Sequence, residues 1–128
     1  MTRHAGRAIV AGAILALIGA ACTSASGSAG PPPSAPPGGA VIVAQDLAFD
    51  RTELDVPAGL AFQLLFDNRD GAPHNVTILD GGGKATFVGE TFGGPGSRIY
   101  AVPAIAAGTY RFRCDVHTDM SGTLVARS

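Results

Sequence analysis

The spacing of glycine and proline after residue 39 most constrains the fold. From residue 40 to 128 we find short β-rich runs and no useful stretch with helical periodicity. Turns are expected at residues 57–59, 80–83, 93–96 and 106–108. The strands expected between them are residues 41–45, 53–56, 60–67, 75–79, 86–89, 98–102, 109–114 and 122–126. This pattern is typical of an all-β sandwich or barrel long enough to bury its own core.

Alternation within two of these runs predicts which side chains face inward, because alternate residues of a strand share a face. Phe62, Leu64 and Phe66 form one bulky apolar face. In residues 109–114, Tyr110, Phe112 and Cys114 share one face and the two arginines between them share the other. His74 has the same parity as Val76 and Ile78. We therefore expect Cys114 and His74 at the inner edge of one end of the sandwich.

Residues 1–22 have the features of a targeting segment. Arg3 and Arg7 precede an apolar run over residues 8–21, which is shorter than the roughly 20 residues needed to span a bilayer. The run ends in Gly-Ala-Ala-Cys22, which resembles the lipobox of bacterial lipoproteins and predicts lipidation of Cys22. A glycine three places before the cysteine departs from the usual leucine-like residue, so ordinary signal cleavage is the alternative. A membrane-spanning anchor is a further alternative. In the first two cases the chain leaves the cytoplasm.

Residues 23–39 predict a disordered tether that holds a folded head away from a membrane surface. They consist almost entirely of Ser, Ala, Gly and Pro and contain no large apolar side chain that could build a core. From Cys22 onward the chain has seven Lys or Arg and ten Asp or Glu. This acidic balance excludes a basic surplus for binding nucleic acid. We expect a three-part chain: signal peptide 1–22, tether 23–39 and domain 40–128.

The segment Cys114-Asp-Val-His117-Thr-Asp-Met120 contains three potential metal ligands at three-residue intervals. Blue electron-transfer copper sites use two imidazoles, one thiolate and a weak axial thioether. The fourth ligand must then be a histidine elsewhere, and outside the leader only His74 remains. Zinc seldom uses a thioether, which favours copper. The sequence therefore predicts one copper ion bound by His74, Cys114, His117 and Met120.

Each of these residues also has an ordinary structural interpretation. A free cysteine or a methionine can simply fill a core, and a lone histidine beside an apolar face is often structural. However, Cys114 has no intrachain disulfide partner if Cys22 is lipidated or removed. An unpaired thiol in an oxidising compartment needs an explanation, and metal coordination supplies one.

Residues 40–128 resemble the cupredoxins, the blue copper proteins of plastocyanin and amicyanin type. The resemblance lies in Pro73-His74-Asn75-Val76, in Gly108-Thr-Tyr-x-Phe-x-Cys114 and in the Cys-x-x-His-x-x-Met loop. It implies an eight-stranded Greek-key sandwich in which His74, Cys114 and His117 are equatorial copper ligands and Met120 is axial. It also implies that the Asn75 side chain hydrogen-bonds the two ligand-bearing loops together beside the thiolate.

The ligand loop departs from amicyanin, because Thr118 and Asp119 replace a proline and a phenylalanine and Asp115 adds a carboxylate. In the family, an apolar patch around the C-terminal histidine docks redox partners. Here Ala72, Pro73 and Val116 can supply such a patch, which Asp119 makes smaller and more acidic. We expect a partner with a basic docking face, or, alternatively, two aspartates that only solvate an exposed loop.

The function expected is a monomeric one-electron carrier, exported and anchored to the cell membrane through Cys22. Four protein ligands fill a mononuclear site and leave no open position for a substrate, so we do not expect an enzyme. Two alternatives stay open: an extracytoplasmic copper-delivery protein, and a metal-free β-sandwich interaction module. The sequence does not distinguish a copper carrier from a copper-delivery protein.

Overall fold

The computed structural model describes residues 30–31 and 33–128, and the described residues contain strands and no helix. The leader and Cys22 lie outside the described residues, and their roles stay predictions. Within the described part of the chain, no segment is a helix long and apolar enough to cross a membrane. In order, the strands are β1 (Ala40–Gln45), β2 (Ala48–Phe49), β3 (Glu53–Pro57), β4 (Phe62–Asn68), β5 (Pro73–His74), β6 (Thr77–Leu79), β7 (Ala85–Val88), β8 (Phe92–Gly93), β9 (Gly96–Val102), β10 (Gly108–Arg113) and β11 (Ser121–Arg127).

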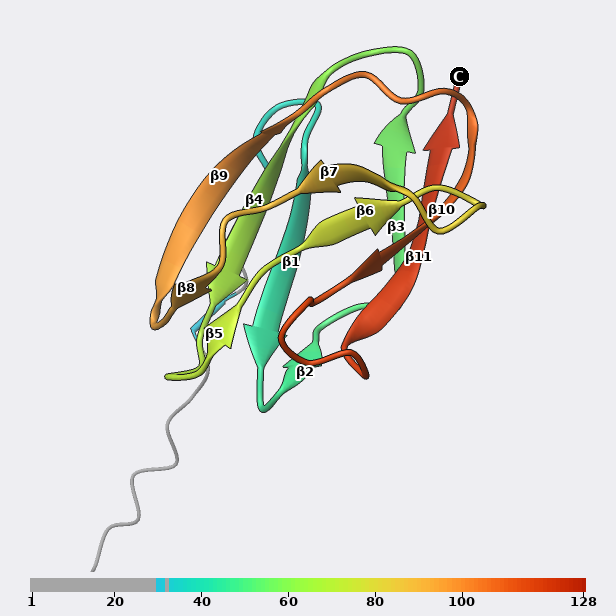
Figure 1. The fold of residues 1–128 in the computed structure, drawn as a ribbon. Helices are drawn as coiled ribbons and strands as arrows, with labels where there is room; N and C mark the ends of the chain where they lie inside the picture. Colours follow the sequence, from blue (N-terminus) through green and yellow to red (C-terminus); the bar gives the residue numbers. More distant parts are fainter. Residues whose placement is uncertain (1–29, 32) are drawn as a thin grey trace, which may run out of the picture. The chain divides into compact units, whose positions relative to one another are not determined.

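Two sheets face each other, and a two-stranded pair lies at one end of the folded unit (Figure 1). One sheet has the order β2-β1-β4-β9 and the other β3-β11-β10-β6-β7, while β5 pairs with β8. Strands that are not consecutive in sequence are neighbours in both sheets, as in a Greek-key sandwich. The pairs β1–β4 and β3–β11 are parallel, and the others are antiparallel. The all-β prediction is confirmed.

The core lies between the two sheets and is formed by the inward faces that alternation predicted. Phe62, Leu64 and Phe66 of β4 are buried in it, as are Phe112 of β10 and Cys114 just beyond it. Burying one such large side chain contributes about 1.5–3 kcal/mol. The ring of Phe66 also packs edge-on against Phe92, with centroids 5.6 Å apart. The candidate site lies at the edge of this core, to which Cys114 belongs.

One expected strand, residues 75–79, is shorter in the structure, because its first two residues belong to no strand. His74 belongs to β5 and pairs with Phe92 of β8, whereas β6 begins only at Thr77 and pairs with β10. Between them, the Asn75 side chain donates to the Gly89 carbonyl and Gly89 N–H donates to the Val76 carbonyl. One side-chain bond and one backbone bond to Gly89 therefore hold residues 75 and 76 between β5 and β6.

The segment before β1 is described only in part. Residues 33–39 contain no strand, and the Gly39 N–H donates to the Pro36 carbonyl at 2.8 Å. The domain boundaries 1–22, 23–39 and 40–128 stay a prediction.

Candidate metal centre

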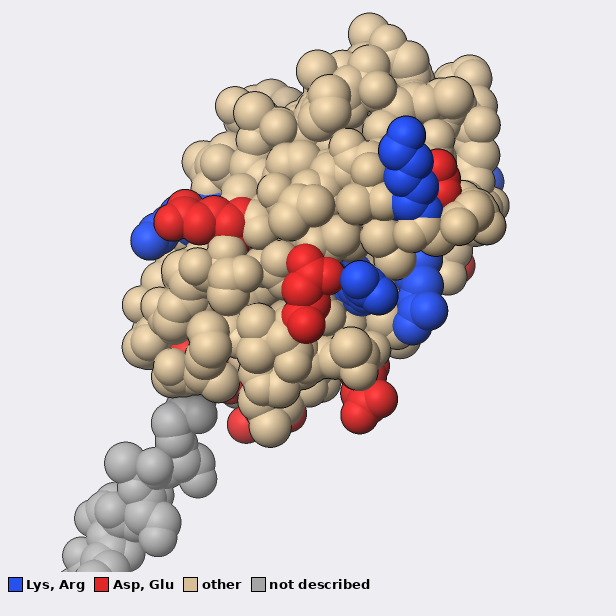
Figure 2. Space-filling view, in the orientation of Figure 1, with Lys and Arg blue, Asp and Glu red and all other residues tan. Residues whose placement is uncertain are grey.

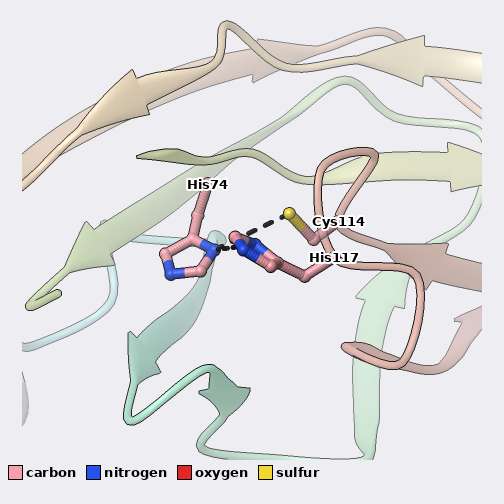
Figure 3. A group of neighbouring side chains, drawn as sticks. All are labelled: His74, Cys114 and His117. Atoms are coloured by element: carbon pink, nitrogen blue, oxygen red, sulfur yellow. Dashed lines mark hydrogen bonds between the residues drawn. The ribbon is translucent and has the colours of Figure 1, made fainter. Parts of the chain in front are cut away.

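Three of the four expected ligands meet at one end of the sandwich (Figure 3). His74 is supplied by β5, Cys114 follows β10 directly, and His117 lies in the loop between β10 and β11. The register explains the convergence: Arg113, the last residue of β10, pairs with Thr77, so Cys114 comes level with the segment that leads back to His74. Sequence-distant ligands thus become neighbours through antiparallel pairing.

The donor atoms of these three residues lie within 4.8 Å of one another. His74 Nδ1 is 3.1 Å from His117 Nδ1 and 3.7 Å from Cys114 Sγ. With bond lengths of about 2.0–2.1 Å to imidazole and about 2.3 Å to thiolate, as for zinc, donors of one ion lie no more than about 4.4 Å apart. Both separations measured from His74 Nδ1 are below that limit. Two imidazoles and a thiolate form the equatorial set of a blue copper site, so the three residues form a potential copper site.

Burial differs among the three side chains in a way that matters for function. His74 and Cys114 are both 0% exposed, whereas the His117 side chain is only partly buried. Beside it, Val116 is exposed on the same loop. The site is therefore shielded from bulk solvent except on the side of His117.

The Cys114–Met120 loop is closed by its own backbone. The Cys114 N–H donates to the Met120 carbonyl at 2.9 Å, and the Met120 N–H donates to the His117 carbonyl at 3.0 Å. The Met120 side chain is 3% exposed and belongs to the same buried cluster as Cys114. Its role as the axial ligand stays a prediction.

Asn75 joins the two ligand-bearing segments. Its Oδ1 accepts the Asp115 N–H at 2.8 Å, and its Nδ2 donates to Asp115 Oδ2 at 2.9 Å and to the Gly89 carbonyl at 3.1 Å. These bonds join the residue after His74 to the residue after Cys114. Asn75 is 1% exposed, so they are made away from competing water. The geometry is the one that the family resemblance implied for this residue.

Asp115 has a role that neither sequence interpretation anticipated. Its carboxylate accepts from Thr77 Oγ1 at 2.6 Å and from Arg113 Nε at 3.2 Å, in addition to Asn75. Burial alone would raise the pKa of Asp115, but the hydrogen bonds from Asn75, Thr77 and Arg113 outweigh it and hold that pKa below the ordinary value. Asp115 therefore braces the start of the ligand loop, and Arg113 balances its charge.

Asp70 is a further contact of the site that sequence reasoning missed. Its Oδ2 lies 3.0 Å from His74 Nε2, the ring nitrogen opposite the one that faces Cys114. Burial would raise the pKa of Asp70, but hydrogen bonds from the backbone N–H groups of Leu47 and Asp46 and from His74 outweigh it and lower that pKa. The one sequence signal was an aspartate four residues before the histidine, which is too common to be informative alone.

Comparison with known proteins is consistent with this geometry. The family model for the cupredoxin-like domain matches residues 12–126. A search of curated proteins finds no match. Among solved structures, reduced auracyanin from Roseiflexus castenholzii is 23% identical with a TM-score of 0.64, covering 74% of this chain and 100% of its own.

Two further structures are similar. Auracyanin A from Chloroflexus aurantiacus, described as a blue copper protein, is 25% identical with a TM-score of 0.61 and covers 68% of this chain and 96% of its own. Amicyanin from Paracoccus versutus is 24% identical with a TM-score of 0.56 and covers 72% of this chain and 84% of its own. The family match spans most of the sequence and agrees with the sandwich and its His-Cys-His cluster: the chain belongs to the cupredoxin-like domain family.

Proposed function

We propose that this protein is a one-electron carrier that holds a single copper ion between His74, Cys114 and His117, with Met120 as a weak axial ligand. The observation that carries the proposal is the convergence of two imidazoles and a thiol within 4.8 Å at a buried end of the sandwich. Similarity to auracyanin A, a blue copper protein, and to amicyanin, a Cu(I) form of which has been solved, supports copper as the metal.

The protein's own residues account for the properties that such a carrier needs. Copper, when bound, supplies a centre that gains and loses one electron. The buried side chains of His74 and Cys114 keep water out, and the Asn75–Asp115 hydrogen bonds restrict movement of the two ligand segments. His117 is partly exposed and gives an electron a short route to the surface. Four protein ligands leave no open position for substrate, so we infer no enzymatic activity.

We also infer that the folded domain works outside the cytoplasm, on a tether. The support is in the sequence: a charged and apolar leader, a cysteine in a lipobox-like context, and a Pro/Ser/Gly/Ala-rich connection to the domain. Mass spectrometry of the protein from membranes tests this inference. A diacylated N-terminal Cys22 is expected, whereas a free cysteine or a soluble product cut beside it would contradict the lipid anchor.

Copper loading provides the direct test of the proposed site. Addition of Cu(II) to the purified protein is expected to give one equivalent of bound copper and an intense blue colour from thiolate-to-copper charge transfer. Reversible voltammetry of the loaded protein should then give fast one-electron transfer. A colourless, metal-free product would leave only a β-sandwich interaction module. Slow voltammetry with ready loss of copper to a chelator would instead indicate copper delivery.

We further propose that the redox partner docks around His117 with a basic face. Val116 is 46% exposed, Asp119 and Asp46 are exposed, and Asp70 is partly exposed near His74. On the face shown in Figure 2, acidic side chains lie along the lower edge, where Figure 1 has β2 and β5, without basic side chains beside them. Leu47, 56% exposed in the β1–β2 turn, is a candidate apolar contact that the sequence did not single out.

Salt dependence is the measurement for this docking face. The electron-transfer rate constant with a basic redox protein should fall as salt rises from low to physiological concentration, because opposite charges steer the encounter. Asp119→Asn should weaken that dependence. Asp55→Asn is the matched control, because this exposed carboxylate lies far from the site. Asp55 pairs with Val125, and Val125 pairs with Thr109. Thr109 precedes Cys114 by five residues, which correspond to about 16 Å along a strand. A rate insensitive to salt, or equal effects of the two variants, would contradict a basic docking face at this end.

A further inference from the structure

The carboxylate of Asp70 is bound from two sides. Oδ1 accepts the Asp46 N–H at 2.8 Å, and Oδ2 accepts the Leu47 N–H at 3.0 Å while also lying 3.0 Å from His74 Nε2. The Asp70 N–H in turn donates to Asn68 Oδ1 at 3.0 Å, at the end of β4. Through its carboxylate and its backbone N–H, Asp70 thus connects the β1–β2 turn, the end of β4 and the histidine of β5.

The turn that holds Asp70 has an unusual backbone. Gln45 pairs with Ala48, so Asp46 and Leu47 form a two-residue hairpin loop, with φ of 55° and 58°. Two successive positive φ values are required by the type I′ turn, which favours Asn-Gly, and they are costly for leucine. In this conformation both N–H groups point at one carboxylate, as in the backbone nests that bind anions. The turn therefore forms a fixed receptor for the charge of Asp70.

The contact with His74 determines which ring nitrogen carries hydrogen. A carboxylate can only accept, so the bond at 3.0 Å requires a hydrogen on Nε2 of His74. In the neutral ring Nδ1 then has a free lone pair, directed toward Cys114 Sγ and His117 Nδ1. Nδ1 is the atom that a metal in this cluster would contact. With the ring 0% exposed, no water competes for either nitrogen.

We propose that Asp70 is a positioning residue that fixes the tautomer and ring orientation of His74 for metal binding, and that the Asp46–Leu47 turn is the anchor of this device. The inference rests on the proposed copper function and extends it to a part of the chain outside the ligand segments. Partners of this kind around a metal-binding histidine typically contribute 10–100-fold to metal affinity.

The test compares Asp70→Asn with Asp50→Asn in the full-length protein at neutral pH. Asp50 is a matched control, since its carboxylate also accepts a backbone N–H, that of Val43 at 2.8 Å, and pairs with Arg51 and not with a histidine. The first readout is ¹⁵N NMR of the His74 ring in the metal-free protein, and the second is copper affinity by chelator competition. The wild type and Asp50→Asn should have the Nε2–H tautomer and equal affinity. Asp70→Asn should have a mixture of tautomers and an affinity lower by about 10–100-fold.

Two further measurements keep the inference testable if Asp70→Asn folds poorly. Asp70→Glu, which restores the charge, should recover part of the lost affinity. In the metal-free wild type itself, a His74 ring with its hydrogen mainly on Nδ1 would overturn the inference without any variant. Equal affinities for Asp70→Asn and the wild type would overturn it as well. Failure of the proposed function is a separate result, because the wild type would then not bind copper at all while its His74 tautomer is still measured.

Discussion

Cys114→Ser is expected to abolish the intense visible absorption of the copper-loaded protein completely. The absorption arises from the thiolate, and a serine hydroxyl is neither a thiolate nor a comparably soft ligand for copper. Cys114 is completely buried, at 3.7 Å from His74 Nδ1, and no other described cysteine can replace it. Visible absorption and bound copper per protein are the measurements.

Met120→Leu serves as the comparison for this prediction. Leucine keeps the volume and apolar character of a side chain that is 3% exposed, while removing the thioether. We expect the blue colour to persist and the reduction potential to change, because an axial ligand tunes the potential without carrying the charge-transfer band. Circular dichroism of both metal-free variants should match the wild type. A Cys114→Ser protein that kept its blue colour would exclude Cys114 as the ligand.

Asn75→Leu is expected to lower the free energy of unfolding of the metal-free protein by about 2–4 kcal/mol. The substitution is nearly equal in size but leaves the Asp115 N–H and the Gly89 carbonyl without their side-chain partner, and each buried orphan costs about 1–3 kcal/mol. Among the described residues, every buried side-chain nitrogen and oxygen has a partner, so no spare group is available to compensate. Chemical denaturation with the metal removed measures this cost directly.

Thr86→Val is a suitable control for Asn75→Leu. The hydroxyl of Thr86, on β7, donates one part-buried hydrogen bond to the Ile78 carbonyl at 3.2 Å. Removal of this bond should lower the free energy of unfolding by about 1 kcal/mol. Beyond stability, Asn75→Leu should broaden the electron paramagnetic resonance signal of the copper-loaded protein, because Asp115 and the ligand beside it lose their connection to β5. If both variants lost the same free energy of unfolding and the copper spectra were unchanged, Asn75 would not be a structural link between the segments of the site.

Much of the fold follows from local sequence patterns. Alternation in residues 60–67 and 109–114 predicted which faces are buried, because a strand directs successive side chains to opposite sides and only one side can exclude water. Phe66 and Phe112, both 0% exposed, confirm this. The sequence also predicted that Cys114 and His117 lie at one site, because they are three positions apart, and the structure brings both beside His74.

The short strands around the site could not be predicted from such patterns. Strands β2, β5 and β8 have two residues each, too few to show any periodicity. They exist because partners from other parts of the chain hold them, as Phe92 of β8 holds His74. The left-handed turn at Asp46 and Leu47 likewise lacks the Asn-Gly pair from which a type I′ turn can be predicted.

By itself, therefore, the sequence determined the all-β architecture, the inward faces and a set of residues with the chemistry of a copper site. Only the tertiary structure decided how those residues are supported: Asn75 bonded to Asp115 across 40 positions, and Leu47 bonded to Asp70 across 23. The physical reason is that burial produces a periodic pattern of apolar residues along a strand, whereas a hydrogen bond between residues distant in sequence produces no such pattern. Its partners are defined only when the strands have paired and brought them within about 3 Å.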